Sequence, residues 1–247
     1  MCGRFVSTTT PADLVDLLGE LSWDPAETLA PSWNVAPTNP VPAVLERVDR
    51  ETGEVVRQLR PLRWGLVPSW AKDPSAGARM INARSETVHE KPAFRKAFAA
   101  RRCVIPADGY FEWRPVEASG DRKAFKQPYY LSTGSVMLMA GLYEFWRDRS
   151  VPDDDPAAWL TTTTVITTDA TDSAGRIHDR MPLAISLEDL ADWLDPGNSD
   201  PTDLRRLLHT PAEGDLAVRA VSTAVNSVRS NGPELLDAVP DPLGLTA

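Results

Sequence analysis

The sequence is poor in the residues that build disulfide scaffolds and metal sites. It has two cysteines, Cys2 and Cys103, and three histidines in 247 residues. A small secreted domain carries a dense, even set of cysteines, and a structural zinc site needs four Cys or His ligands. The three histidines, His89, His178 and His209, form no ligand pair at helical or hairpin spacing. We therefore expect no disulfide framework, no metal and no other cofactor.

Long apolar runs are also missing. No segment approaches the roughly 20 apolar residues that span a bilayer, and Arg4 is followed by the polar stretch VSTTTPAD rather than by the core of a signal peptide. Hydrophobic residues at 42% and charged residues at 25% are typical of a globular domain with a proper core. No internal repeat or interdomain linker is apparent. We expect a single-domain cytoplasmic protein that has no membrane partner.

Positive charge is scarce in the chain as a whole, since the net charge is −9, which argues against a nucleic acid as partner. Residues 57–126, however, contain 15 Lys and Arg against 7 Asp and Glu, a local charge of +8, and the rest of the chain carries −17. This asymmetry permits a basic groove on an acidic body. Charge alone favours the plainer alternative, a solvated basic surface.

Helical and strand patterns are mixed without a regular βαβ rhythm, which predicts an α+β domain with a mainly antiparallel sheet. Thr10 and Pro11 are an N-cap and a first helical residue for the first helix. The predicted helices are residues 11–21, 91–102, 187–194 and 201–210. The predicted strands are residues 33–48, 54–67, 103–113, 127–133, 136–146, 161–170 and 216–222. Residues 147–158 are acidic and predict a surface loop.

The chain opens MCGRF, with a thiol at the second residue. Initiator methionine is usually removed before a small residue, so Cys2 would carry a free α-amine, of ordinary pKa 7.7–8.0, beside a thiol of ordinary pKa 8.5. Such an aminothiol can form a Schiff base with an aldehyde and then close a thiazolidine, or it can attack an amide as an N-terminal nucleophile. The alternative is a chance cysteine in a frayed terminus.

Two further motifs carry groups suited to a polar substrate. INARSE places Asn82 and Arg84 on one face of an extended segment, where an amide can orient an amine and a guanidinium can clamp a phosphate. ADGYFEW places Glu112 between two aromatic residues, and desolvation there would raise its pKa and suit it to proton transfer. Strand alternation equally allows Glu112 to face solvent.

One histidine and two tryptophans complete the candidate set. RIHDRMP holds His178, a proton shuttle near neutral pH, between Arg176 and Arg180. RWGLVPSWAKD brings Trp64, Trp70 and cations such as Lys72 together, and rings interleaved with cations suit single-stranded nucleic acid. Tryptophans are more often part of a core, and we expect at least one of these two to be so.

Taken together and in order, MCGRF, WNVAPT, RWGLVPSWAKD, INARSET, CVIPADGYFEW and HDRMP closely resemble the motifs of the SRAP family. These are SOS response-associated proteins that bind abasic sites in single-stranded DNA. The resemblance covers residues 1–228 and leaves residues 229–247 as a C-terminal extension. It implies one α+β domain built on a mainly antiparallel, barrel-like β-sheet with peripheral helices.

The resemblance also implies a catalytic role for each candidate. After loss of Met1, Cys2 would crosslink to the ring-opened abasic sugar through a thiazolidine and so shield the lesion from strand cleavage. Asn82 would position the terminal amine and the sugar. Glu112 would manage protons at the Schiff base, and His178 would act as the general acid for ring opening. Peptidase-like processing of the chain's own start is implied as well.

The implied partner is single-stranded DNA containing an abasic site, at a junction with duplex. The residues implied to contact it are Arg4, Arg84, Trp70, Arg180, Trp64 and Lys72. The resemblance adds no metal or cofactor. We expect a monomer, because such a groove needs no symmetry, and a cytoplasmic location with nucleoid association when DNA is bound.

Two alternatives belong to other classes of protein. Class II glutamine amidotransferases also begin Met-Cys-Gly, and in such an N-terminal-nucleophile hydrolase the thiol would attack an amide and the basic segment would have no purpose. A non-catalytic reader of modified DNA bases would not need Cys2 at all.

Overall fold

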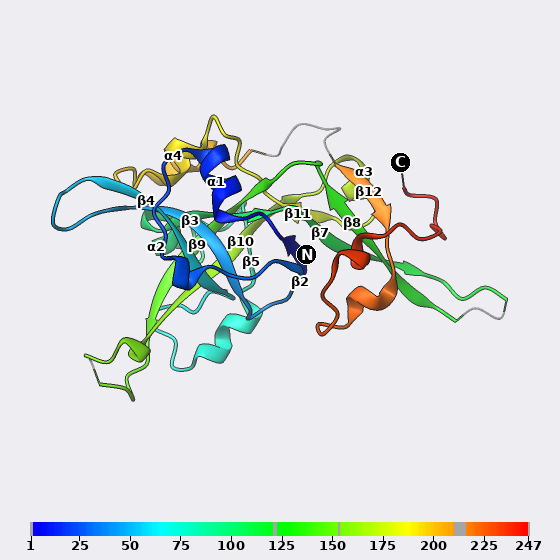
Figure 1. The fold of residues 1–247 in the computed structure, drawn as a ribbon, viewed down its shortest axis with the longest axis horizontal. Coiled ribbons are helices and arrows are strands. Elements are labelled where there is room, and N and C mark those ends of the chain that lie inside the picture. Colours follow the sequence, from blue (N-terminus) through cyan, green and yellow to red (C-terminus); the bar gives the residue numbers. More distant parts are fainter. Residues whose placement is uncertain (1, 121–122, 153, 210–215, 247) are drawn as a thin grey trace.

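Five strands close into a barrel, which occupies one half of the molecule beside a second sheet (Figure 1). The computed structural model describes residues 2–120, 123–152, 154–209 and 216–246. In pairing order, the barrel strands are β10 (Trp159–Asp169), β4 (Val55–Trp64), β3 (Pro40–Val48), β6 (Arg102–Ala107) and β9 (Met137–Arg147), and β9 pairs with β10 to complete the ring. These pairs are antiparallel except for β10 with β4. A closed ring pairs the backbone groups that an open sheet leaves free at its edges.

A second, antiparallel sheet packs beside the barrel. Its strands, in order, are β12 (Ala217–Ala220), β8 (Phe125–Ser132), β7 (Gly109–Val116), β1 (Phe5–Ser7) and β2 (Ser32–Val35). The β3–β4 hairpin projects at one end of the molecule and the β7–β8 hairpin at the other (Figure 1). The chain passes from β6 of the barrel directly into β7 of this sheet, so the two sheets are parts of one domain.

Two short strands flank the C-terminal half of β10. Strand β5 (Asn82–Arg84) lies parallel to β10, with Asn82 opposite Val165. Strand β11 (Arg180–Pro182) lies antiparallel to it, with Arg180 opposite Asp169. Segments far apart in the sequence thus meet at one end of the barrel.

The helices of the described residues are short and peripheral. They are α1 (Pro11–Leu18), α2 (Arg95–Ala100), α3 (Asp172–Gly175), α4 (Leu190–Leu194) and α5 (Pro201–Arg206). Helix α1 begins as predicted, because the Thr10 hydroxyl accepts from the backbone of Asp13 and the Asp13 carboxylate accepts from the backbone of Thr10. Helix α2 is shorter than predicted because Arg102 already belongs to β6. The buried guanidinium of Arg102 donates to the carbonyls of Phe98, Ala99, Trp193, Asp195 and Asn198.

The largest apolar cluster joins the barrel interior to the second sheet. It contains Cys2, Phe5, Trp64, Cys103 and Tyr110. Cys103 is fully buried, as expected of a small apolar side chain in CVIP. The N-terminal residues are therefore part of the core, and the prediction of an α+β domain with a mainly antiparallel, barrel-like sheet is confirmed.

The chain after residue 228 packs onto the same domain. Leu235 joins an apolar cluster with Val6 and Phe111, and the Tyr129 hydroxyl donates to Asp241. The predicted acidic loop lies between β9 and β10, with residue 153 outside the described residues, as is residue 210 of the predicted helix 201–210. None of the helices in the described ranges is long and apolar enough to cross a membrane.

Candidate functional site

The N-terminal strand holds Cys2 inside the protein. Strand β1 pairs on one side with β2, where Phe5 lies opposite Val35, and on the other with β7, where Phe5 lies opposite Tyr110. The Phe5 ring packs edge-on against Trp64, with 5.0 Å between ring centroids. Cys2 is 0% exposed, and burial raises the pKa of its thiol. Cys2 is therefore part of the packed core and does not lie in a frayed segment.

Asn82 contacts Cys2 directly. Its side-chain Nδ2 donates to the Cys2 carbonyl at 2.8 Å. Its Oδ1 is buried and, among the described residues, has no hydrogen-bond partner. Because β5 is extended, Arg84 lies on the same side of this strand as Asn82, and it is exposed. The amide thus lies against the thiol-bearing residue while the guanidinium is open to solvent.

Glu112 faces the interior rather than solvent. In β7 it shares a face with Tyr110, while Phe111 packs in a different apolar cluster beside Tyr130. Glu112 is 4% exposed, and this burial raises the pKa of its carboxyl, an effect that the N-terminal amine and, to a smaller extent, His178 partly offset. The negative charge of Glu112 in turn helps to raise the pKa of Cys2. A carboxyl with a raised pKa is suited to taking and returning protons near neutral pH.

His178 lies in the turn between α3 and β11. Its Nδ1 accepts from the backbone N–H of Arg180 at 3.0 Å and lies 2.8 Å from the carboxylate of Asp179. When Nδ1 accepts from Arg180, the neutral ring carries its proton on Nε2; when Nδ1 instead donates to Asp179, Nε2 carries a proton only in the doubly protonated ring. Arg4, Glu112 and His178 line one open cavity of about 500 Å³.

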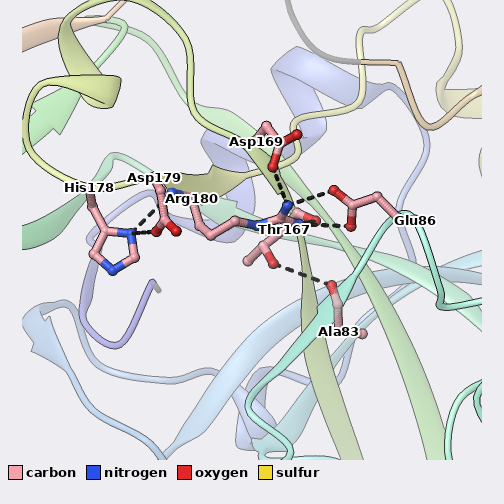
Figure 2. Close-up of polar contacts among 7 residues, drawn as sticks. All are labelled: Ala83, Glu86, Thr167, Asp169, His178, Asp179 and Arg180. Carbon is pink, nitrogen blue, oxygen red and sulfur yellow. Dashed lines mark hydrogen bonds and ion pairs between the residues drawn. The ribbon is translucent and has the colours of Figure 1, made fainter.

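Arg180 is held by the protein itself (Figure 2). Its buried guanidinium donates to Glu86 at 2.6 Å, to Asp169 at 2.6 Å and to the Thr167 carbonyl at 2.6 Å. The Arg180 hydrogen bond lowers the pKa of Glu86 despite the opposing effect of burial. The expectation that Arg180 contacts a DNA phosphate is corrected, because its two terminal nitrogens bind β10 and Glu86 and the side chain is only 7% exposed. Its Nε is buried without a hydrogen-bond partner among the described residues. Arg180 anchors the turn that carries His178.

Arg4 lies at the wall of the cavity. Its guanidinium donates to Asn34 Oδ1 at 2.9 Å and to the Val225 carbonyl at 2.8 Å. Burial lowers its pKa. The side chain is half-buried, so it is fixed in place and still reaches the cavity that Glu112 and His178 share.

The two tryptophans of RWGLVPSWAKD separate into different environments. Trp64 is fully buried, and its indole N–H donates to the Ile81 carbonyl at 2.9 Å. The expectation that Trp64 contacts DNA is corrected, since it belongs to the core. Trp70 is 63% exposed, and Lys72 near it is exposed as well. Of these three residues, Trp70 and Lys72 are accessible to a nucleic acid.

Sequence reasoning missed three residues that line the cavity, namely Trp113, Lys126 and Asn226. The β7–β8 hairpin places Lys126 opposite Pro115, and the Trp113 indole donates to Asn226 Oδ1 at 2.7 Å. Lys126 and its partner Pro115 lie just outside the predicted strands at 103–113 and 127–133, so the predicted strands did not place Lys126 at the site. Asn226 follows the last strand, and no motif in the sequence indicated that it would line the cavity. Across the described residues, no group of three or more His, Cys, Asp or Glu side chains is arranged to hold a metal ion.

Comparisons with known proteins show what this chain is similar to. The family model described as SOS response associated peptidase (SRAP) matches residues 1–228. The chain is 37% identical to the abasic site processing protein YoqW of Bacillus subtilis, over 96% of this chain and 100% of that protein. It is 30% identical to the abasic site processing protein HMCES of Xenopus tropicalis, over 97% of this chain and 78% of that protein.

Solved structures share the fold. A protein from Bacteroides thetaiotaomicron superposes with a TM-score of 0.75 at 24% identity, over 97% of this chain and 100% of that chain. A phage-related protein from Bordetella bronchiseptica gives a TM-score of 0.63 at 27% identity, over 89% of this chain and 94% of that chain.

Proposed function

The chain belongs to the SOS response-associated peptidase (SRAP) family, and we propose that it senses abasic sites in single-stranded DNA and captures them covalently through Cys2. The observation that carries the proposal is the burial of Cys2 in a core site where Asn82 binds its carbonyl and Glu112 is close enough to raise its pKa. The names of the relatives, abasic site processing proteins, support the substrate.

The chemistry begins after removal of Met1. The ring-opened abasic sugar presents an aldehyde, and the Cys2 α-amine attacks its carbon and releases water, which leaves an imine. The Cys2 sulfur then attacks the same carbon, its proton is transferred to the nitrogen, and a thiazolidine closes. No oxidant or reductant is consumed. The lesion is thereby held as a DNA–protein crosslink and shielded.

Each polar neighbour has a role in these steps. Asn82 orients the terminal residue, and its buried Oδ1 is an acceptor for the amine or for a sugar hydroxyl. Glu112, with its raised pKa, accepts the amine proton and returns a proton to the departing water. His178 donates from Nε2 to the ring oxygen of the closed sugar and so promotes ring opening.

The DNA strand follows exposed cations toward the cavity. Arg84 and Lys72 contact phosphates, Trp70 stacks on a base, and Arg4 holds a phosphate beside the lesion. The local charge of +8 over residues 57–126 supports this path on an otherwise acidic chain. We propose that the exposed Trp70 segment favours a junction between single strand and duplex, and that the protein acts as a monomer in the cytoplasm, at the nucleoid.

The family name also supports a peptidase activity, which we propose acts on the chain's own N-terminus. Hydrolysis of the Met1–Cys2 bond would expose the amine that the crosslink needs. Intact mass measures this directly, because a chain that retains Met1 has no free Cys2 amine and cannot close a thiazolidine.

The decisive experiment mixes the purified protein with a single-stranded oligonucleotide that contains one abasic site. We expect a heat-stable shifted band on a denaturing gel, which Cys2→Ala abolishes. Glutamine hydrolysis without an adduct would instead favour the amidotransferase class. Abasic-site binding that Cys2→Ala leaves unchanged, again without an adduct, would favour a non-covalent reader.

A further inference from the structure

The Tyr110 hydroxyl is buried in the same apolar cluster as Cys2 and has no hydrogen-bond partner among the described residues. The Tyr110 side chain is 1% exposed. Buried hydroxyls nearly always have one. The neighbouring tyrosines of β8 follow that rule, because Tyr129 donates to Asp241 at 2.7 Å and Tyr130 donates to the Asp108 carbonyl at 2.8 Å. An orphaned hydroxyl at this position therefore needs an explanation.

The position of Tyr110 provides one. Tyr110 and Glu112 lie on the same face of β7, and Tyr110 belongs to the same apolar cluster as Cys2. Strand pairing sets Tyr110 opposite Phe5, on the strand that leads from Cys2. Burial, followed by the negative charges of Cys2 and Glu112, raises the pKa of Tyr110, so its hydroxyl keeps its proton and stays a hydrogen-bond donor.

The proposed chemistry lacks such a donor. Ring closure needs the sulfur as a thiolate, and burial together with the charge of Glu112 makes a thiolate at Cys2 costly. The charge of the N-terminal amine, followed by the backbone N–H of Arg4, lowers the pKa of the Cys2 thiol and partly offsets that cost. One amide is a small share of the hydrogen bonding that an anion has in water.

We propose that Tyr110 is the second donor, so that its hydroxyl and the Arg4 backbone N–H together hold the Cys2 thiolate during ring closure. This rests on the proposed function and deepens it. The thiol proton passes to the imine nitrogen, the sulfur–carbon bond forms, and Tyr110 keeps its own proton throughout. The free hydroxyl is thus a donor kept ready for a charge that exists only during the reaction.

The test is Tyr110→Phe, which removes one oxygen and leaves the ring. Adduct formation with the abasic oligonucleotide should slow by about tenfold or more, because the thiolate that closes the ring loses a charge-assisted hydrogen bond. The thermal unfolding temperature should be unchanged or higher, since the lost hydroxyl had no partner. Tyr130→Phe removes a buried hydroxyl that is already bonded, and it should keep the wild-type rate of crosslinking.

Two readouts separate a thiolate donor from a purely structural tyrosine. Borohydride added early should trap more imine on Tyr110→Phe than on the wild type, because the amine step is intact and ring closure is slow. Alkylation of Cys2, followed by peptide mass spectrometry, should shift to higher pH in Tyr110→Phe. A wild-type rate, imine yield and alkylation profile in Tyr110→Phe would overturn the inference. If the wild type forms no adduct, the proposed function fails, while alkylation, which needs no DNA, still reports on Tyr110.

Discussion

The burial of Glu112 destabilises the folded protein when the carboxyl is ionised, and the same burial gives the carboxyl the raised pKa that the proposed chemistry needs. A carboxylate on the solvent side of β7 would be hydrated, but on the inner face it is 4% exposed and its pKa is raised by burial. The ionised form is therefore less favourable in the folded chain than in the unfolded one. A group that exchanges protons near neutral pH needs this condition.

Replacing Glu112 with Gln should stabilise the protein at pH 7 while abolishing or strongly slowing crosslinking. Because the folded-state pKa lies above the unfolded value, wild-type stability falls as pH rises from about 4.3 toward the folded pKa, and a neutral amide avoids that loss. Calorimetry should show a higher Tm for Glu112→Gln at pH 7, by about 2–4 °C for each kcal/mol in a domain of this size, and a smaller difference at pH 4.

The matched control is Glu117→Gln, which changes an exposed carboxylate just beyond β7. It should leave both the Tm and the crosslinking rate at wild-type values. A Tm at pH 7 that is lower for Glu112→Gln than for the wild type would mean that the ionised carboxylate stabilises the fold.

At the scale of elements, strands β5, β10 and β11 form the frame that positions the site. Strand β5 presents Asn82 to the terminus, and β11 begins with Arg180 directly after His178 and Asp179. The Arg180 guanidinium ties β11 to β10 and to Glu86 after β5 (Figure 2). The geometry of the histidine turn thus depends on a buried cation that the proposed chemistry does not use.

Arg180→Met should loosen this frame without weakening DNA contacts. The change removes the donor to the Thr167 carbonyl and the counter-ion of Glu86, at a cost of about 1–3 kcal/mol. The pKa of Glu86 is depressed in the folded wild type, so its part of this stability is present above about pH 4.5 and is lost as pH falls further. Urea titrations at pH 7 and pH 4 measure the loss, which should be smaller at pH 4.

Crosslinking by Arg180→Met should also slow, because His178 is less well held, whereas the salt dependence of DNA binding should match that of the wild type. A residue that binds a DNA phosphate would behave differently. If Arg180→Met kept its stability and lost salt-dependent binding, the role of Arg180 as an anchor would be wrong.

How far the sequence could predict these features depends on how local they are. The start of α1 follows from Thr10 and Asp13, three residues apart, and the β3–β4 hairpin follows from adjacent strands. The orientation of Glu112 does not, because alternation allows either face and the choice is made by pairing of β7 with β1. The sequence also does not predict which of Trp64 and Trp70 is buried, since both lie in one motif, yet Trp64 is 0% exposed and Trp70 is 63% exposed. The predicted contact of Arg180 with DNA could not be assessed from the sequence either, because its ion-pair partners Glu86 and Asp169 are not its sequence neighbours.

At the scale of the whole molecule, an acidic protein has to attract a polyanion. The net charge of −9 would repel DNA at long range, whereas the basic segment of residues 57–126 acts at short range. The segment runs through β4, β5, β6 and β7 and ends on β8, so the barrel and the second sheet both contribute to it. Binding should therefore be carried by a few local phosphate contacts, and salt should weaken it in proportion to their number.

Single neutralisations measure how many contacts there are. Arg84→Ala and Lys126→Ala, each made in a Cys2→Ala background so that binding stays reversible, should each reduce the slope of log K against log salt by about 0.7 for single-stranded DNA. Arg206→Ala, an exposed residue of α5 outside the basic segment, removes the same charge and should leave the slope unchanged. Equal effects of all three variants would show that net charge governs binding, and a slope near zero in the parent would exclude a phosphate-tracking groove.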